Sequence, residues 1–387
     1  MTQGEQVGVL WGEMLRKYNI KIHFAHQTFK WNNEAKGNAA VYCVIIGFAG
    51  YDTTVKHLYH YDDIKGDPTV LTVKNINPYL VEGNDVIISR RQKPLCAVPE
   101  IGIGNQPIDG GNYLFTTEKK ELFIIQEPQS KKWFRRWLGS DEFINGYERW
   151  CLWLGDCPPG ELRQMPEAMK RVQAVRSMRS ASSRASTKKL ANTPTRFQVE
   201  NMPKSSYLIV PEVSSERRRY IPIGYESPET LSSNLVKIVP NASLFHFGVL
   251  TSEMHMTWVR YVCGRLKSDY RYSKDIVYNN FPWPQSPTDK QVKDVEAAAQ
   301  KVLDVRASFV GSSLADLYDP LTMPPALVKA HQDLDRAVDQ CYRKQAFTNE
   351  TRRIEYLFEL YDQYTAPLVA AAGVGGKKKS KTVKSLV

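Results

Sequence analysis

The sequence contains no apolar run of about eighteen residues, the length that a helix needs to cross a bilayer. Its first residues also lack the basic start and the purely apolar stretch of a secretory signal. These absences argue against the membrane-spanning and secreted classes of protein. We therefore expect a cytoplasmic protein that has no membrane partner.

Cysteines are few and show no metal-binding pattern. The six cysteines form no CxxC motif and no Cys/His pair with the spacing of a zinc site. Scattered cysteines of this kind are typical of buried free thiols in a reducing compartment. The sequence thus predicts free thiols and no metal site.

Positive charge is what the chain has in excess. The 387 residues carry 52 Lys and Arg against 41 Asp and Glu, which gives a net charge of +11. Between residues 161 and 220 there are 13 basic residues and 5 acidic ones. Such a block suits a polyanion, because each neutralised phosphate releases condensed counterions. A solvated, flexible surface explains the charge equally well.

The first ninety residues have the pattern of an α/β sheet. Apolar spacing predicts a helix at residues 4–18 and strands at 20–26, 57–61, 69–73 and 85–89. The run AAVYCVIIGF at 39–48 is so apolar that we expect a strand covered on both faces. No strand followed by a glycine loop precedes these elements, so the segment is interpreted as the trailing half of a larger sheet.

Composition divides the rest of the chain. A stretch rich in Pro and Gly begins near residue 94, and the linker PWPQSPTD lies near residue 285. Between them, residues 173–195 are polar, basic and serine-rich, and we expect them to be mobile without a partner. After the linker, helical spacing predicts three helices, the first capped by Thr288 or Asp289. The expected domains are 1–93, 94–284 and 285–370, followed by a disordered basic tail at 371–387.

Several long motifs carry a family resemblance. They include TQGEQVGVLW, IKIHFAHQTFKWNNEAKGNAAVYCVIIGF, NINPYL, IPIGY, TSEMHMTWVRYVCGRLKSDYRYSKDIVYNNFPWP and SLADLYDPLTMPPALVKAHQDLDRAVDQCYR. From residue 2 to about residue 369 the chain resembles the MmeI-like type II restriction–modification enzymes, single chains that join a nuclease, an adenine-N6 methyltransferase and a target-recognition domain. The resemblance implies an α/β plus α+β fold: the trailing part of a Rossmann-like methyltransferase sheet, a mixed target-recognition domain and a C-terminal three-helix module.

The departures from that family concern the chemistry. No Asn-Pro-Pro-Tyr loop is present, and Asn77-Pro78-Tyr79 lacks the second proline, so we interpret it as a structural turn. No glycine-rich strand–loop–helix entry for S-adenosylmethionine is found, and Gly102-x-Gly104 does not precede a helix. In the family, TQGEQVGxLW follows shortly after the catalytic loop. We therefore expect no catalytic residue and no bound cofactor in this chain alone, with S-adenosylmethionine used by the complete enzyme.

An N6 methyltransferase must swing adenine out of the duplex and hold it between flat side chains. The resemblance places AAVYCVIIGF at the strand whose far aromatic residue helps to sandwich that base. It nominates Phe48 for flipped-base stacking, with Phe29 and Trp31 as lesser candidates. The alternative is that Phe48 is an ordinary core residue.

Candidates for reading DNA bases lie in SSERRRYIPIGY and SNLVKIVPNAS, around which the resemblance places recognition determinants. They are Glu216, Arg217, Arg218, Arg219, Lys237 and Asn241. In a strand-like segment Glu216 would point the same way as Arg218, and Arg217 the same way as Arg219. The alternative is that these arginines touch phosphates only.

Candidates for phosphate contact are basic residues among serines or tyrosines. They are Arg176, Arg179, Arg184, Lys188, Lys189, Arg265 and Lys267. The first five would belong to a loop that is ordered on binding. For the last two, an amphipathic helix that packs Trp258, Val262 and Leu266 explains the spacing as well.

The leading hypothesis is the sequence-specific DNA recognition portion of an adenine-specific (N6) DNA methyltransferase of a restriction–modification system, inactive alone. Its expected partners are double-stranded DNA and a separate chain that carries the N-terminal methyltransferase half. The alternatives are a non-enzymatic DNA-binding specificity subunit and a truncated gene product.

Overall fold

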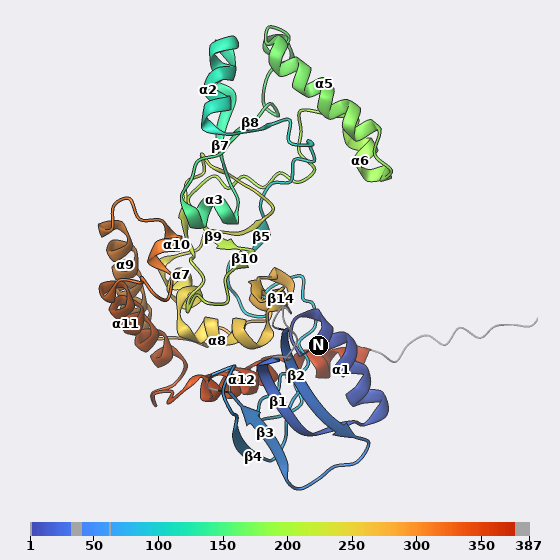
Figure 1. The fold of residues 1–387 in the computed structure, drawn as a ribbon, viewed down its shortest axis with the longest axis vertical. Helices are drawn as coiled ribbons and strands as arrows, with labels where there is room; N and C mark the ends of the chain where they lie inside the picture. The colour runs from blue at the N-terminus through green and yellow to red at the C-terminus, as the bar shows by residue number, and fades with distance from the viewer. Residues whose placement is uncertain (1, 32–40, 62, 376–387) are drawn as a thin grey trace, which may run out of the picture. The chain divides into compact units, whose positions relative to one another are not determined.

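A computed structural model describes residues 2–31, 41–61 and 63–375, which fall into two compact units. The first unit is built from residues 1–96, 279–283 and 347–387, and the second from residues 97–278 and 284–346. Each unit is thus assembled from segments that are far apart in the chain (Figure 1). Within the described residues, no helix is both long enough and apolar enough to cross a membrane.

Within its described residues, the first unit contains a mixed sheet and two helices. Its elements are α1 (Glu5–Tyr18), β1 (Lys21–Trp31), β2 (Val41–Ala49), β3 (Lys56–His60), β4 (Thr69–Val73) and α12 (Glu350–Gly375). The strand order is β2-β1-β3-β4, with β1 antiparallel to β2 and parallel to β3. The helix and the first four strands predicted from the sequence are confirmed. Residues 85–89 form no strand.

The apolar strand β2 differs from its prediction. Tyr42, Ile45 and Phe48 are exposed, and none of its described residues is buried. β2 is also the last strand of the order, and β1 is its only partner in the described part of the chain. The expectation of a strand covered on both faces is therefore wrong for this chain.

The Asn77-Pro78-Tyr79 segment is a structural turn, as predicted. The side-chain oxygen of Asn77 accepts hydrogen bonds from the backbone N–H groups of Tyr79 (2.9 Å) and Val81 (3.3 Å). The Tyr79 hydroxyl in turn accepts one from the backbone N–H of Ile88 (3.1 Å). Asn77 is fully buried in this role, so its amide is used to hold the chain and is not available to a substrate.

Helix α12 has the predicted inward face, yet it packs in the first unit. Its Ile354, Leu357, Phe358 and Tyr361 are buried. The ring of Phe358 lies 5.1 Å from that of Tyr79, and the Tyr361 hydroxyl donates to Asn280 (3.3 Å). The other two helices of the expected three-helix module lie in the second unit. Apolar spacing predicts which face a helix buries but not the partner that covers it.

The second unit contains three small sheets and most of the helices. Its strands are β5 (Gly102–Ile103), β6 (Leu114–Phe115), β7 (Phe134–Leu138), β8 (Trp150–Leu152), β9 (Tyr207–Pro211), β10 (Val213–Ser214), β11 (Gly224–Glu226), β12 (Leu231–Ser232), β13 (Val236–Pro240), β14 (Gly264–Leu266) and β15 (Asp269–Arg271). They form sheets of order β11-β9-β13-β5, β12-β7-β8-β6 and β10-β15-β14.

The described residues of the second unit also form thirteen helical segments. They are α2 (Thr117–Gln126), η1 (Pro128–Trp133), α3 (Ser140–Asn145), α4 (Pro159–Leu162), α5 (Pro166–Ser180), α6 (Ala185–Lys189), η2 (Leu190–Asn192), α7 (Leu244–Thr251), α8 (Glu253–Val262), η3 (Lys274–Tyr278), α9 (Asp289–Ser308), α10 (Leu314–Leu317) and α11 (Pro325–Tyr342). Helices α9 and α11 pack together and α7 packs on α9. The Thr288 hydroxyl accepts from the backbone N–H of Gln291 (3.3 Å), which confirms the predicted cap.

Residues 173–195 are mostly helical and not a mobile loop, so this expectation is wrong. Helices α5 and α6 cover most of the segment and follow each other along the chain (Figure 1). On α5 the buried side is made by Ala168, Val172, Val175 and Arg179, the spacing of one helix face. The face is hard to detect in the sequence because its fourth member is a charged residue.

Candidate nucleic-acid interface

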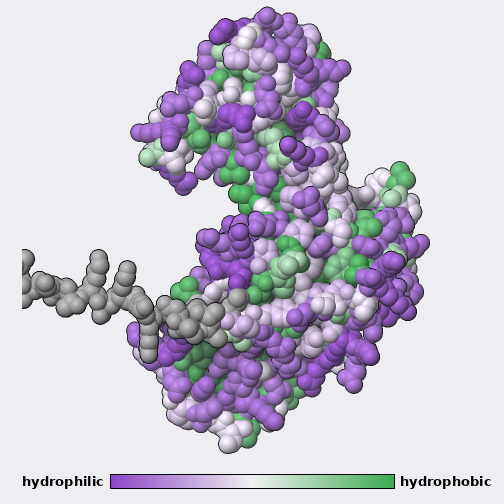
Figure 2. All heavy atoms as spheres, turned by 180° about the vertical axis from the view of Figure 1, so that it is seen from behind, coloured by the Kyte–Doolittle hydropathy of each residue, from purple (hydrophilic) through white to green (hydrophobic). Residues whose placement is uncertain are grey.

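Four cations lie open to solvent on and after α5. Arg176, Arg184, Lys188 and Lys189 are exposed, and in the described part of the chain their side chains have no hydrogen bond or ion pair. No acidic residue occurs between Ala168 and Val199. Most of the surface of this part of the second unit is hydrophilic (Figure 2). This α5–α6 surface (Arg176, Arg184, Lys188 and Lys189) can therefore attract phosphates without first losing a partner.

Arg179, which was grouped with these cations, has a different role. It is fully buried, and its guanidinium donates to five backbone carbonyls at 2.7–3.0 Å. The acceptors are the carbonyl oxygens of Pro107, Ile108, Leu190, Thr193 and Arg196. Burial lowers the pKa of Arg179 from its ordinary value. A side chain held in this way has no surface left for a phosphate; it ties α5 to the segments around it.

The arginine loop (residues 215–219) is a turn and not a strand. The backbone N–H of Arg218 donates to the carbonyl of Ser215 (3.2 Å), and that of Glu216 donates to the Asp269 carboxylate (3.3 Å). Alternate side chains in a turn do not share a face, so the predicted pairing of Glu216 with Arg218 and of Arg217 with Arg219 is wrong.

The three arginines of the loop differ in freedom. Arg217 is 61% exposed and lies 3.9 Å from the Asp319 carboxylate, at the limit of an ion pair. Arg218 is half-buried, and burial lowers its pKa. Arg219 donates to Glu253 (3.1 Å); burial opposes the charge of Arg219, but Tyr220 and Glu253 raise its pKa overall. Arg217 is thus the arginine that can reach outward most easily.

The two candidates in the next strand have unlike surroundings. Lys237 on β13 is buried, and its ammonium group pairs with the Glu212 carboxylate at 2.5 Å. Asn241 directly follows β13, is exposed and has a φ of 59°, a left-handed conformation that asparagine tolerates. Lys237 therefore forms a buried ion pair inside the unit, whereas the side chain of Asn241 is accessible to a ligand.

Arg265 and Lys267 lie in a hairpin and not in a continued helix. Helix α8 ends at Val262, and β14 pairs with β15. The Arg265 guanidinium lies 4.0 Å from the centre of the Tyr270 ring and donates to the Ser268 carbonyl (3.1 Å). Lys267 is exposed at the turn with a φ of 58°. The aromatic residues of this segment have structural contacts, and Lys267 is the exposed charge.

Phe48 is placed on the open side of β2 in the first unit. It is 49% exposed, and its ring centre lies 6.2 Å from that of Trp11, with the two ring planes nearly perpendicular. The alternative of an ordinary core residue does not fit this exposure. Of the lesser candidates, Phe29 stacks on Tyr61 (5.2 Å), whereas Trp31 is 53% exposed.

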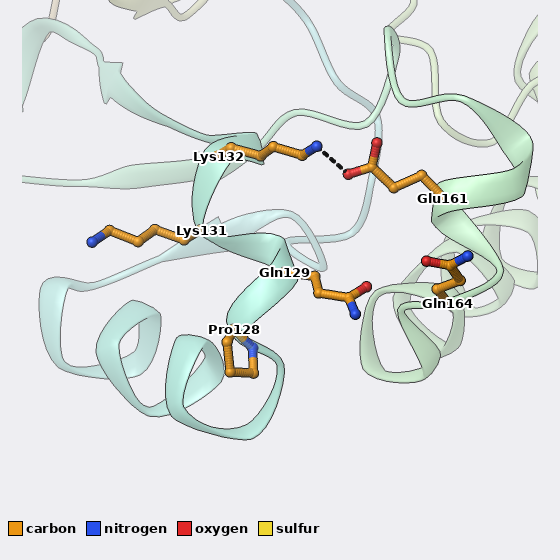
Figure 3. Close-up of a pocket in the computed structure, with 6 residues that line it drawn as sticks. All are labelled: Pro128, Gln129, Lys131, Lys132, Glu161 and Gln164. Atoms are coloured by element: carbon orange, nitrogen blue, oxygen red, sulfur yellow. Dashed lines mark ion pairs between the residues drawn. The ribbon is translucent and has the colours of Figure 1, made fainter.

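A shallow depression beside η1 and α4 contains cations that the sequence reasoning missed. It is lined by Pro128, Gln129, Lys131, Lys132, Glu161 and Gln164. The Lys132 ammonium group pairs with Glu161 at 2.6 Å, whereas Lys131 points away from that pair (Figure 3). The signal for these residues was present in the sequence as two adjacent lysines, but they lie outside the 161–220 block on which the charge argument rested.

The Gly102-x-Gly104 segment has a structural place in the second unit. The glycine pair Gly102-x-Gly104 lies at β5, where a Cβ on Gly104 would come within 2.1 Å of the Ser233 carbonyl. Its glycine thus permits close strand packing. The six cysteines are free, and within the described ranges no three His, Cys, Asp or Glu side chains are grouped to hold a metal ion.

Comparison with known proteins assigns the three regions. Residues 82–285 match the model of the MmeI target recognition domain, residues 287–369 that of the MmeI C-terminal domain, and residues 1–60 that of the MmeI DNA-methyltransferase domain. A similar curated protein is DNA methyltransferase A of Bacillus subtilis (strain 168), 41% identical over 365 residues, which cover 94% of this chain and 41% of that protein.

A solved structure shows the same architecture. It is that of the type IIL restriction–modification enzyme MmeI in complex with DNA, with 49% identity and a TM-score of 0.87. The match covers 94% of this chain and 48% of the other. The chain thus spans less than half the length of each of these two relatives.

Proposed function

The chain belongs to the MmeI family of type IIL restriction–modification enzymes, and from that membership we propose that it is the part of an adenine-specific (N6) DNA methyltransferase that recognises duplex DNA. The observation that carries the proposal is the match of residues 82–285 to a target recognition domain, on which the open cations lie. The similarity to a chain solved in complex with DNA supports it.

Two kinds of contact would divide the work of recognition. The α5–α6 surface, with Lys267 as a further exposed cation, would hold phosphates and so position the domain on the duplex. The exposed residues Arg217 and Asn241, together with the partly buried Glu216, would meet base edges, since Arg pairs with guanine, Asn with adenine and Glu with cytosine. Arg218 and Arg219 would hold the loop from behind.

Methyl transfer would need residues beyond the 387 of this sequence. In the complete enzyme S-adenosylmethionine supplies the methyl group, and the chain's own contribution would be to present the target adenine. Phe48, half-exposed on β2, would stack on the flipped base. The half that binds the cofactor would be supplied by a separate chain. Six free thiols fit a reducing cytoplasm as the place of action.

A non-enzymatic specificity subunit is the second candidate, since it too would lack the Asn-Pro-Pro-Tyr loop. A mixing experiment distinguishes the two proposals. A second chain that bears an Asn-Pro-Pro-Tyr loop should restore methylation under the first proposal and have no effect under the second. Aggregation of the pure chain through β2 would instead indicate a truncated product.

The direct test uses the pure chain, labelled S-adenosylmethionine and an arbitrary duplex of about thirty base pairs. We expect duplex binding that weakens steeply with salt and no methyl transfer. Absence of binding at low salt would refute the recognition role. Methyl transfer without a second chain would refute the claim that these residues lack the cofactor site.

A further inference from the structure

A buried polar network joins the arginine loop to helices α11 and α8. Its centre is Asp335 on α11, which is only 6% exposed. One carboxylate oxygen accepts from the Tyr220 hydroxyl and the other from the backbone N–H of Glu253, both at 2.7 Å. Tyr220 directly follows the loop, and Glu253 is the first residue of α8. One side chain thus bridges the end of the loop and the start of a helix.

Glu253 carries the network on to Arg219. Its carboxylate accepts from Arg219 (3.1 Å) and from Arg260 (2.5 Å). Arg260 also donates to the backbone carbonyl of Arg219 (3.0 Å). Burial raises the pKa of Glu253, but the two arginines lower it overall, so the carboxylate stays ionised. Both the side chain and the backbone of Arg219 are therefore fixed from the α8 side.

His331 holds Tyr220 from a second direction. It lies one helical turn before Asp335 on α11, and its ring stacks on that of Tyr220 at 4.1 Å with an angle of 17° between the planes. Burial, together with Arg306 and Arg219, lowers the pKa of His331 well below its ordinary value. The neutral imidazole therefore stacks without adding a charge, and α11 grips Tyr220 by its ring and by its hydroxyl.

The opposite end of the arginine loop is held by the β14–β15 hairpin. Ser214 pairs with Tyr270 in the β10–β15 ladder, and the backbone N–H of Glu216 donates to Asp269 (3.3 Å). Both ends of a five-residue turn are thus anchored to different elements. Between the anchors, Arg217 stays 61% exposed.

We propose that Asp335 is a positioning residue for the reading of DNA sequence: through Tyr220 and Glu253 it fixes the arginine loop so that Arg217 reaches a base edge. The proposal rests on the proposed function and gives α11 of the C-terminal domain a part in specificity. Bidentate base contacts require a side chain placed within about 0.5 Å, whereas attraction to phosphates does not. A loosened loop should therefore lose discrimination while it keeps general affinity for duplex.

The first test measures loop rigidity without DNA. Trypsin cleaves after Arg217, and brief digestion of the full chain reports how often the loop opens. In D335N the amide cannot accept from both donors, so we expect cleavage in the loop to accelerate about tenfold to a hundredfold. Y220F loses one hydrogen bond and keeps the ring stack, so a severalfold acceleration is expected.

Two controls make this measurement specific. Cleavage after Arg184, which is exposed and outside the network, should keep its rate in every variant. Y207F removes a buried hydroxyl that bonds to the Thr230 carbonyl (2.9 Å) and to the Ser232 hydroxyl (2.9 Å) in the same unit, outside the network. Its loop cleavage should stay within about twofold of the unsubstituted chain. Equal acceleration in Y207F and D335N, or none in D335N, would overturn the proposal.

The second test measures discrimination. The unsubstituted chain, D335N and Y220F each select from a pool of duplexes with about ten randomised central base pairs, and their affinities for one arbitrary duplex are compared. We expect a flattened base preference in D335N, a partly flattened one in Y220F, and arbitrary-duplex affinities within about threefold. An unchanged preference in D335N overturns the proposal. If the unsubstituted chain selects nothing, the proposed function fails, and the trypsin rates alone decide whether Asp335 holds the loop.

Discussion

The α5–α6 surface and the arginine loop use the same residue types in opposite ways. On the α5–α6 surface the cations are exposed and have no ion pair in the described residues. In the arginine loop, Arg219 is bound to Glu253 and the turn is anchored at both ends. Exposed cations without a partner attract any phosphate, whatever the base sequence. Cations fixed by hydrogen bonds can instead present a defined geometry to a base edge. Under the proposed function, the α5–α6 surface would supply general affinity for phosphates and the arginine loop would read the sequence.

The largest expected effect, on stability, comes from Arg179, the one cation of the predicted phosphate-contact set on α5 that is buried. Arg179 follows Arg176 by three positions, yet it is buried against five carbonyls. Replacing it leaves those carbonyls without a buried donor, so R179M should lower the free energy of unfolding by about 3–5 kcal/mol. R176M should change it by less than about 0.5 kcal/mol. Urea unfolding of both variants measures the difference, and similar curves would contradict the structural role of Arg179.

The next effect concerns grip. A variant with Gln at Arg176, Arg184, Lys188 and Lys189 should bind an arbitrary duplex about a hundredfold more weakly at moderate salt. The slope of log K against log salt should become shallower by about 3–4, since each lost phosphate contact removes about 0.9. Gel-shift titrations over a salt series measure both quantities.

A matched control removes the same charge elsewhere. Lys290, Lys293, Lys301 and Lys344 are exposed on or near α9 and α11. If Gln at these four positions weakens duplex binding as much as Gln on the α5–α6 surface, the affinity comes from the net charge of the chain and not from that surface.

The third effect sharpens the description of the network. Burial raises the pKa of Asp335 from 3.8 to about 7, against the hydrogen bonds from Glu253 and Tyr220. Between these values the folded chain keeps a proton that the unfolded chain loses, so the contribution of Asp335 to stability decreases as pH rises. From about pH 5 to about pH 8 this loss is on the order of 2–3 kcal/mol. In D335N this pH-dependent loss of stability should be absent. Urea unfolding of D335N and of the unsubstituted chain at about pH 5 and about pH 8 measures the difference. The same change with pH in both proteins would show that Asp335 does not titrate in this range.

The smallest effect on general binding is expected for Arg217. Because it is exposed and only loosely paired, R217A should leave stability and arbitrary-duplex affinity nearly unchanged. It should cost about 1–3 kcal/mol on a selected duplex and relax the preference at one base pair. R184A should instead weaken selected and arbitrary duplexes by the same factor. Loss on both duplexes in R217A would make Arg217 a phosphate contact.

The spacing of apolar residues in the sequence predicted the helices and strands better than it predicted which other elements pack against them. The faces of α9, α11 and α12 and the cap at Thr288 follow from sequence, since each depends on residues within a few positions. The place of α12 and the exposure of β2 depend on partners distant in the chain. Arg179 and Lys237 could not be separated from the open cations, because a buried arginine or lysine has the same letter as a solvated one. The anchors of the arginine loop come from α11 and β15, which no local pattern joins to it.

One measurement tests the central claim most directly: the ratio of affinities of the unsubstituted chain for a duplex selected from a random pool and for an arbitrary duplex at physiological salt. If this chain reads DNA sequence by itself, the selected duplex should bind about a thousandfold more tightly or better. A pool that yields no enriched sequence, with a ratio within about threefold of one, would contradict the account.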